Sequence, residues 1–200
     1  MARRKGGGSE NITFAKGQVS PKGVALWAYL SEPSEGKDGI KPAYKVSIFF
    51  DPADEAFQKF EKIIAAAMKQ YGSTETSPIK AADDYTVKYV TDNNIKGVKA
   101  GQPYVTFRTA EGPVPVVGLD GQATNQEVWS GDIARTQFNI VGWSMMKRRG
   151  VSCFLSGVQL LKTSREGFLS TSKLGAVEGM ENEGGFQPQS DKSLEELLSG

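Results

Sequence analysis

The side chains that most often carry catalysis are scarce in this chain of 200 residues. It contains no histidine, which removes the commonest general base and metal ligand together with the Ser-His and Cys-His pairings. Its single cysteine, Cys153, lies in an apolar run, where we expect a buried structural thiol. No G-x-x-x-x-G-K-[ST] loop for binding nucleotide phosphates occurs. Most familiar hydrolase mechanisms are therefore excluded.

Two pairs of neighbouring acids could contribute ligands to a metal site. Asp54 and Glu55 fall in the first turn of a predicted helix, where the helix dipole accounts for them. Asp83 and Asp84 fall in a polar loop, and a solvated turn is the simpler interpretation of that pair. Because two-metal nucleases assemble scattered acids, a metal-dependent nuclease stays open as the enzymatic alternative. The preferred interpretation is a non-enzymatic protein without a metal or a cofactor.

The remaining candidates are aromatic and cationic side chains, which suit a surface for single-stranded nucleic acid. Bases stack on aromatic rings at roughly 1 to 3 kcal/mol each, while Lys and Arg neutralise phosphates. A run of three cations also begins the segment KRRGVSCFLSGVQLLK (147–162). The predicted binding residues are Trp27, Tyr29, Lys45, Phe49, Arg108, Arg135, Trp143, Lys147, Arg148 and Arg149. The alternatives are a solvated hairpin tip for the cations, and a second small core or a subunit contact for the aromatics.

Alternation with a period of two predicts that these residues lie on β-strands. The expected strands are GVALWAYL (23–30), YKVSIFF (44–50), PYVTFRT (103–109) and the two arms of a long hairpin over residues 133–162. In the first strand, the aliphatic residues at even positions share one face, and Trp27 and Tyr29 share the other. In the second strand, Lys45 and Phe49 lie opposite the aliphatic residues.

One segment, DPADEAFQKFEKIIAAAMKQYG, has helical periodicity instead. Asp51 is its expected N-cap, Pro52 its first helical residue and Gly72 its C-terminal stop. Shorter strands are expected near residues 12–16, 85–90 and 114–117. Several strands with one helix and turn-rich connections indicate a mainly β fold, a small closed or nearly closed antiparallel barrel with one helix inserted at about 51–71.

Charge is unevenly distributed along the chain. Residues 178–200 contain six acids and one lysine, so the net charge of +1 for the whole chain combines a body of about +6 with a tail of about −5. The composition predicts a flexible basic arm over residues 1–11 and a flexible, disordered acidic tail over residues 166–200. A tethered acidic tail competes with nucleic acid for a positive groove, although a merely solubilising tail fits the composition equally well. The acids assigned to this regulatory tail are Glu178, Glu181, Glu183, Asp191, Glu195 and Glu196.

Six segments, taken in order, resemble a family of phage-encoded single-stranded DNA-binding proteins, long known only as a domain of unknown function. They are YKVSIFFDPADEAFQKFEKII, PIKAADDY, GQPYVTFRT, PVVGLDGQ, WSGDIARTQFNIVGW and RRGVSCFLSGVQLLK. The most specific element is the last, a strand reading G-V-S-x-x-L-x-x-V-Q-x-L-K after a G-D/S-x-x-R strand. The resemblance implies an OB-type nucleic-acid-binding domain over residues 12–165, similar to the binding proteins of T-odd phages with their acidic carboxyl-terminal tails.

The sequence therefore predicts a largely sequence-independent single-stranded DNA-binding protein that acts in phage DNA replication or recombination. The expected partners are single-stranded DNA, duplex DNA once the tail is displaced, replication or recombination proteins that contact the tail, and further copies of the chain. No membrane partner is expected, and the place of action is the cytoplasm of the infected host. Two other interpretations stay open: a β-rich virion or assembly protein with aromatic subunit contacts, and a module that binds duplex DNA or RNA.

Overall fold

The computed structural model describes residues 12–36, 41–145 and 148–164. Their elements, in chain order, are β1 (Ile12–Val19), β2 (Gly23–Ser34), β3 (Ala43–Phe49), α1 (Glu55–Tyr71), β4 (Ile79–Ala81), α2 (Asp84–Asp92), β5 (Pro103–Thr109), β6 (Val116–Val117), β7 (Ile133–Met145) and β8 (Arg148–Lys162). The predicted arm (1–11), Lys147 and the acidic tail (166–200) with all its assigned acids lie outside the described residues.

Five strands close into a ring through their backbone hydrogen bonds. β2 pairs with β3 and β7, β3 pairs with β5, and β8 pairs with both β5 and β7. The strands β1, β4 and β6 extend this ring from β7, β5 and β8. The predicted mainly β, OB-like fold class is thereby confirmed. One detail differs from the expectation of purely antiparallel pairing, because β5 and β6 run parallel to β8.

The predicted hairpin over residues 133–162 is confirmed as β7 and β8, which pair from Ile133 and Lys162 to Met145 and Arg148. Alternate residues of both strands enter the core inside the ring, where Phe138 contacts Phe107 at a centroid distance of 5.0 Å. Cys153 belongs to this core, and burial raises the pKa of its thiol to about 12. It is the structural cysteine that its apolar surroundings predict.

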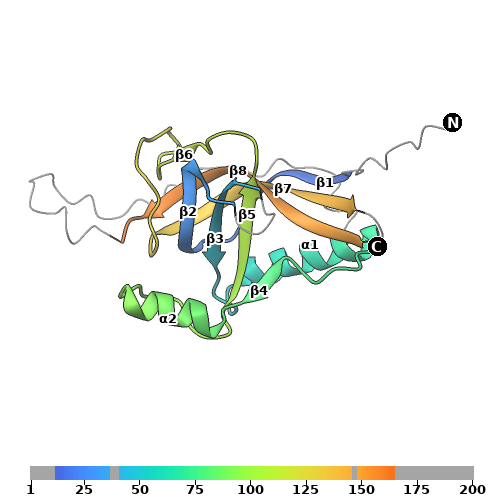
Figure 1. Cartoon of the computed structure of the whole chain (residues 1–200), viewed down its shortest axis with the longest axis horizontal. Helices are drawn as coiled ribbons and strands as arrows, with labels where there is room; N and C mark the ends of the chain where they lie inside the picture. The colour runs from blue at the N-terminus through green and yellow to red at the C-terminus, as the bar shows by residue number, and fades with distance from the viewer. Residues whose placement is uncertain (1–11, 37–40, 146–147, 165–200) are drawn as a thin grey trace, which may run out of the picture.

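Helix α1 covers the core beside β7 and β8, as Figure 1 shows at the lower right. It begins later than predicted, because its N-cap is Asp54, whose side chain accepts a 2.8 Å hydrogen bond from the amide of Ala56. Asp51 instead accepts from the amide of Ala53 in the preceding turn, at 2.9 Å. The helix ends as predicted at Gly72, which adopts the left-handed φ of 62°. Its buried residues are Phe57, Phe60, Ile64 and Ala67.

The segment 85–90, predicted as a strand, is helical and forms most of α2. Asp83 caps this helix, because its carboxylate accepts from the amide and the hydroxyl of Thr86 at 2.8 and 2.7 Å. The buried pair Thr86 and Val90 is spaced by four residues, which is helical spacing. The fold therefore contains a second helix among the described residues, and Figure 1 places α2 below β3, apart from α1.

The alternation predicted for residues 23–30 is interrupted at Trp27. This residue has a left-handed φ of 50°, and the pairing of β2 with β3 changes register between Leu26 and Tyr29. The irregularity reverses the side of the strand on which following residues lie. Leu30 therefore joins the core inside the ring, whereas Val24 and Leu26 belong to a second apolar cluster that includes Val90 of α2. The expectation that even-numbered residues share one face is wrong for this reason.

Candidate nucleic-acid interface

The outer face of β2, β3 and β5 carries a row formed by one aromatic ring and two cations. Tyr29 is the register partner of Lys45, and Lys45 is the partner of Arg108. Directly opposed residues project from the same face of a sheet. The adjacent Val46 and Phe107 are fully buried in the core, so the row projects outward.

Lys45 and Tyr29 are in direct contact within this row. The ammonium nitrogen of Lys45 lies 5.2 Å from the centroid of the Tyr29 ring, which is a cation–π distance. Tyr29 is 42% exposed and therefore retains ring surface that a base could cover. A phosphate bound by Lys45 would lie beside this ring, which is the pairing of groups that a single strand presents.

A groove with a volume of about 560 Å³ begins at this row and reaches β4 and the β7–β8 hairpin. We call it the cationic groove. Its cations are Lys41, Lys45, Lys80 and Arg108, its ring is Trp143, and its acids are Glu35 and Glu75. Lys41, Lys80 and Arg108 are exposed, so their charges are available to a ligand. The excess of cations over acids favours an anionic ligand in the groove.

Trp143 is fixed in the groove by a glycine on the opposite strand. It pairs with Gly150 across the hairpin, and a β-carbon added to Gly150 would come within 2.4 Å of Cζ2 of the indole. The indole therefore lies directly against the glycine backbone, where any larger residue would displace it. Gly150, the glycine of the Arg-Arg-Gly sequence, therefore leaves the space that the Trp143 indole, a candidate stacking ring, occupies.

Arg148 borders the cationic groove and is held by one of its acids. Its guanidinium donates from Nε and Nη2 to the two carboxylate oxygens of Glu75 at 2.7 and 2.6 Å. This hydrogen bond is the main reason why the pKa of Glu75 is lowered and that of Arg148 is raised. The bidentate geometry is the one that Arg also uses for phosphate. Glu75 therefore occupies the position that a phosphate would take on Arg148.

Next to the cationic row, the same face becomes aromatic. Ser47 and Thr106 share a 2.8 Å hydrogen bond, and beyond them Phe49 and Tyr104 stack with centroids 4.6 Å apart. Burial and then the charge of Asp83 raise the pKa of Tyr104. We call Trp27, Phe49, Tyr89 and Tyr104 the aromatic cluster. The outer face therefore carries a cationic row and, beside it, the aromatic cluster.

Comparison with solved structures identifies this arrangement of strands in phage proteins. The single-stranded DNA-binding protein gp2.5 of bacteriophage T7 matches with a TM-score of 0.51 and 14% identity, over 79% of this chain and 97% of that one. The single-stranded DNA-binding protein of bacteriophage Enc34, in a complex with single-stranded DNA, matches with a TM-score of 0.53 and 14% identity, over 78% of this chain and 87% of that one. The chain has the fold of phage single-stranded DNA-binding proteins. No protein-family model and no curated protein sequence matches it.

On this phage single-stranded DNA-binding fold, four of the predicted residues gather at one place. Lys45, Arg108 and Trp143 line the cationic groove, and Tyr29 contacts Lys45 at its edge. Arg148 joins them at the border through its bond to Glu75. These residues come from β2, β3, β5 and the two arms of the hairpin.

The other predicted residues lie elsewhere or have another environment. Phe49 is only 1% exposed, so it supports Trp27 and Tyr104 and offers no ring face of its own to a base. Arg135 borders a different pocket, near α1, and donates from Nε to Oε1 of the buried Gln159 at 2.7 Å. Arg149 lies 6.0 Å from the ring centroid of Tyr71 at the end of α1.

Three residues of this face are missing from the residues predicted from the sequence. Lys41 precedes β3 in a loop, and Lys80 lies in the three-residue strand β4, which is too short for alternation to be read. Tyr104 stands on the same side of β5 as Arg108, so the alternation of PYVTFRT provides the signal that could have found it. Lys80 is the register partner of Tyr104, which continues the outward row across β4.

Asp83 and Asp84, the acids named for a nuclease alternative, lie at the start of α2. Asp83 caps α2, and no group of three or more His, Cys, Asp or Glu side chains gathers among the residues that the structure describes. The described helices are also too short or too polar to span a membrane.

Proposed function

We propose that the chain binds single-stranded DNA on the outer face of β2, β3 and β5, and that it does so without catalysing a reaction. The phosphates lie on Lys41, Lys45, Lys80 and Arg108, and bases stack on Tyr29 and Trp143. Trp27 and Tyr104 extend the stacking surface beyond the groove.

The observation that carries this proposal is the contact of the half-exposed Tyr29 ring with Lys45, at the edge of a groove that Trp143 and three further cations also line. Duplex DNA also attracts cations, but its base faces are covered by stacking and cannot meet Tyr29 or Trp143. A single strand offers phosphates and open base faces together. The shared fold with a protein whose structure contains single-stranded DNA supports the same ligand class.

We further propose a role in phage DNA replication or recombination, where displaced strands must be covered. The six acids of residues 178–200 would compete with DNA for the cationic groove and would be offered to replication or recombination proteins when DNA displaces them. Duplex DNA becomes a second, weaker ligand once the tail is displaced.

Intrinsic tryptophan fluorescence tests the proposal, because Trp27 and Trp143 lie on the proposed face. The full chain is titrated with oligo-dT and with a duplex of equal length at low and moderate salt. We expect strong quenching by the single strand and weaker binding of the duplex. Strand integrity in Mg²⁺ is followed in the same samples, and intact strands are expected.

Absence of binding to either ligand at low salt would contradict the proposal and would favour a protein whose aromatics form subunit contacts. Tighter binding of the duplex would mean that the preferred ligand is double-stranded nucleic acid. Cleavage of either strand in Mg²⁺ would contradict the non-enzymatic assignment.

A further inference from the structure

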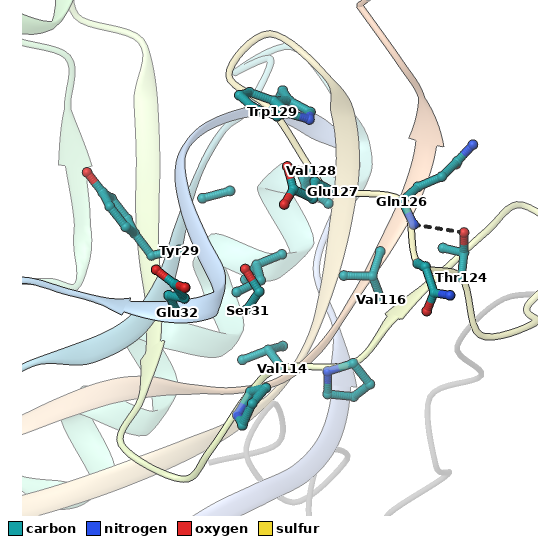
Figure 2. Close-up of a pocket in the computed structure, with 15 residues that line it drawn as sticks. Tyr29, Ser31, Glu32, Val114, Val116, Thr124, Gln126, Glu127, Val128 and Trp129 are labelled. Carbon is teal, nitrogen blue, oxygen red and sulfur yellow. Dashed lines mark hydrogen bonds between the residues drawn. The ribbon is translucent and has the colours of Figure 1, made fainter.

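A second pocket adjoins the cationic groove through Tyr29. It has a volume of about 530 Å³ and lies between β2, the loop 124–129 and residues 113–116, which lead into β6. We call it the β2-loop pocket. Figure 2 shows Tyr29, Ser31 and Glu32 on the β2 side, with Glu127, Val128 and Trp129 on the opposite side. Tyr29 is a lining residue of this pocket, and its ring contacts Lys45 of the cationic groove, so the two sites are neighbours along the surface.

The lining of the β2-loop pocket suits a flat, uncharged group. Its floor includes the buried Leu30, Val114 and Val128, and its rim carries two half-exposed rings, Tyr29 at 42% and Trp129 at 44% exposure. The described residues that line it include no Lys or Arg, in contrast to the groove. The exposed carboxylates of Glu32 and Glu127 give it a negative charge. A phosphate is therefore repelled, whereas an apolar ring face is accepted.

Backbone and side-chain hydrogen bonds hold the pocket in shape. The buried carboxylate of Asp132 accepts from the amide of Trp129 at 2.8 Å and from the amide of Ser164 at 2.7 Å. The amide of Thr124 donates to the carbonyl of Val116 at 3.0 Å, and the amide of Gln126 donates to Oγ1 of Thr124 at 3.1 Å, the dashed line in Figure 2. The loop is fixed at both ends, so a ligand does not need to order it.

We infer that the β2-loop pocket receives one nucleobase of a strand whose phosphates lie in the cationic groove, and that Glu32 and Glu127 favour a base that presents N–H donors. This inference rests on the proposed function and adds a base preference to it. Carboxylates accept hydrogen bonds and donate none when ionised. Guanine presents two adjacent donors on its Watson–Crick edge, and cytosine and adenine each present an amino group. Thymine presents one N–H between two carbonyl oxygens, which the carboxylates repel.

The test compares oligo-dT of about 15 nucleotides, within the range of OB-fold site sizes, with the same oligonucleotide carrying one central dG. The full chain is used, and affinity is measured by fluorescence anisotropy of labelled DNA. We expect the dG-containing strand to bind about tenfold more tightly, in line with a bidentate contact to a base edge. The doubly substituted E32Q/E127Q chain should bind both strands equally, because an amide no longer discriminates between donors and acceptors. The matched control is Glu111→Gln, an exposed glutamate outside both the pocket and the groove.

The outcomes separate this inference from the proposed function. Failure of both oligonucleotides to bind would overturn the proposed function and the inference together. Equal affinity of the wild-type chain for the two strands would overturn only the base preference. A dG preference that persists in E32Q/E127Q would show that the two carboxylates do not make the selective contact and would also overturn the inference. Glutamate-dependent binding of a hexa-arginine peptide, with no base preference, would assign the pocket to a cationic peptide and would also overturn the inference.

Discussion

Arg108 and Arg135 are both candidates for phosphate binding by residue type, but their contacts in the structure differ. Arg108 is exposed in the cationic groove, whereas Arg135 is bonded to the buried Gln159 at a different pocket. Arg108→Gln should therefore weaken oligo-dT binding and reduce the slope of log K against log salt by about 0.7, the value for one phosphate on a single strand. Arg135→Gln should leave that slope unchanged. Titrations at several salt concentrations, with thermal unfolding of both variants, measure this, and a loss of slope in Arg135→Gln would contradict the assigned face.

Substitution of Tyr29 is expected to affect DNA binding, whereas substitution of Phe49 is expected to affect stability. Tyr29→Ala should lose roughly 1 to 3 kcal/mol of binding free energy at every salt concentration, because it removes a stacking ring. Phe49→Ala should instead lower the free energy of unfolding by about 3 to 5 kcal/mol, because the side chain is buried in a packed cluster. Denaturant unfolding and oligo-dT titration of both variants check the assignment. A stable Phe49→Ala chain with weakened binding would show that the ring does contact DNA.

Glu75 is expected to restrain DNA binding through Arg148. Glu75→Gln should release the guanidinium, strengthen oligo-dT binding and increase the salt slope by about 0.7. The pKa of Glu75 is lowered from 4.5, so the ion pair is present at neutral pH and is lost as pH falls through that lowered value. The affinity difference between wild type and Glu75→Gln should therefore disappear in acid. An equal affinity of the two chains at pH 7 would contradict this role.

At the scale of elements, the β7–β8 hairpin brings Trp143 to the groove and sets its orientation. Gly150→Ala should displace the indole, because the new methyl group would lie 2.4 Å from Cζ2. The expected results are a changed tryptophan emission spectrum and weaker oligo-dT binding. Ser156→Ala, at an exposed position of the same strand, is the matched control. An unchanged emission spectrum in Gly150→Ala would contradict the expected displacement, and a changed spectrum with unchanged affinity would mean that the indole position is not important for binding.

At the scale of the whole molecule, the charge separation between body and tail governs the expected salt response. A chain truncated after Val177 loses six acids and one lysine, so its net charge rises from +1 to about +6. We expect tighter oligo-dT binding and a smaller difference between single-stranded and duplex DNA, because no internal anion competes for the groove. Parallel titrations of both chains measure the effect. Identical affinities at low salt would leave the tail with a solubilising role only.

The sequence by itself predicts the long strands β2, β3 and β5, the hairpin and most of α1, because hydrophobic periodicity is a local property. It also identifies Lys45, Arg108 and Trp143 as outward-facing residues of β3, β5 and β7. The alternation predicts a strand over residues 85–90, whereas the structure has a helix there, with Asp83 as its cap and the buried Thr86 and Val90 at helical spacing. A short apolar segment fits both the helical period and the strand period. Here the packing of Val90 against Val24 and Leu26 of β2 decides in favour of the helix.

Only the tertiary structure decides which of these residues lie together. The register of three strands aligns Tyr29, Lys45 and Arg108, and closure of the ring brings the hairpin with Trp143 to the same groove. The bulge at Trp27 and the burial of Phe49 change the roles that alternation predicts, because register and burial depend on distant segments. Arg135 lies at a different pocket, beside residues of α1. The sequence gives the type of each side chain. Residues on strands far apart in the chain become neighbours only when those strands pair.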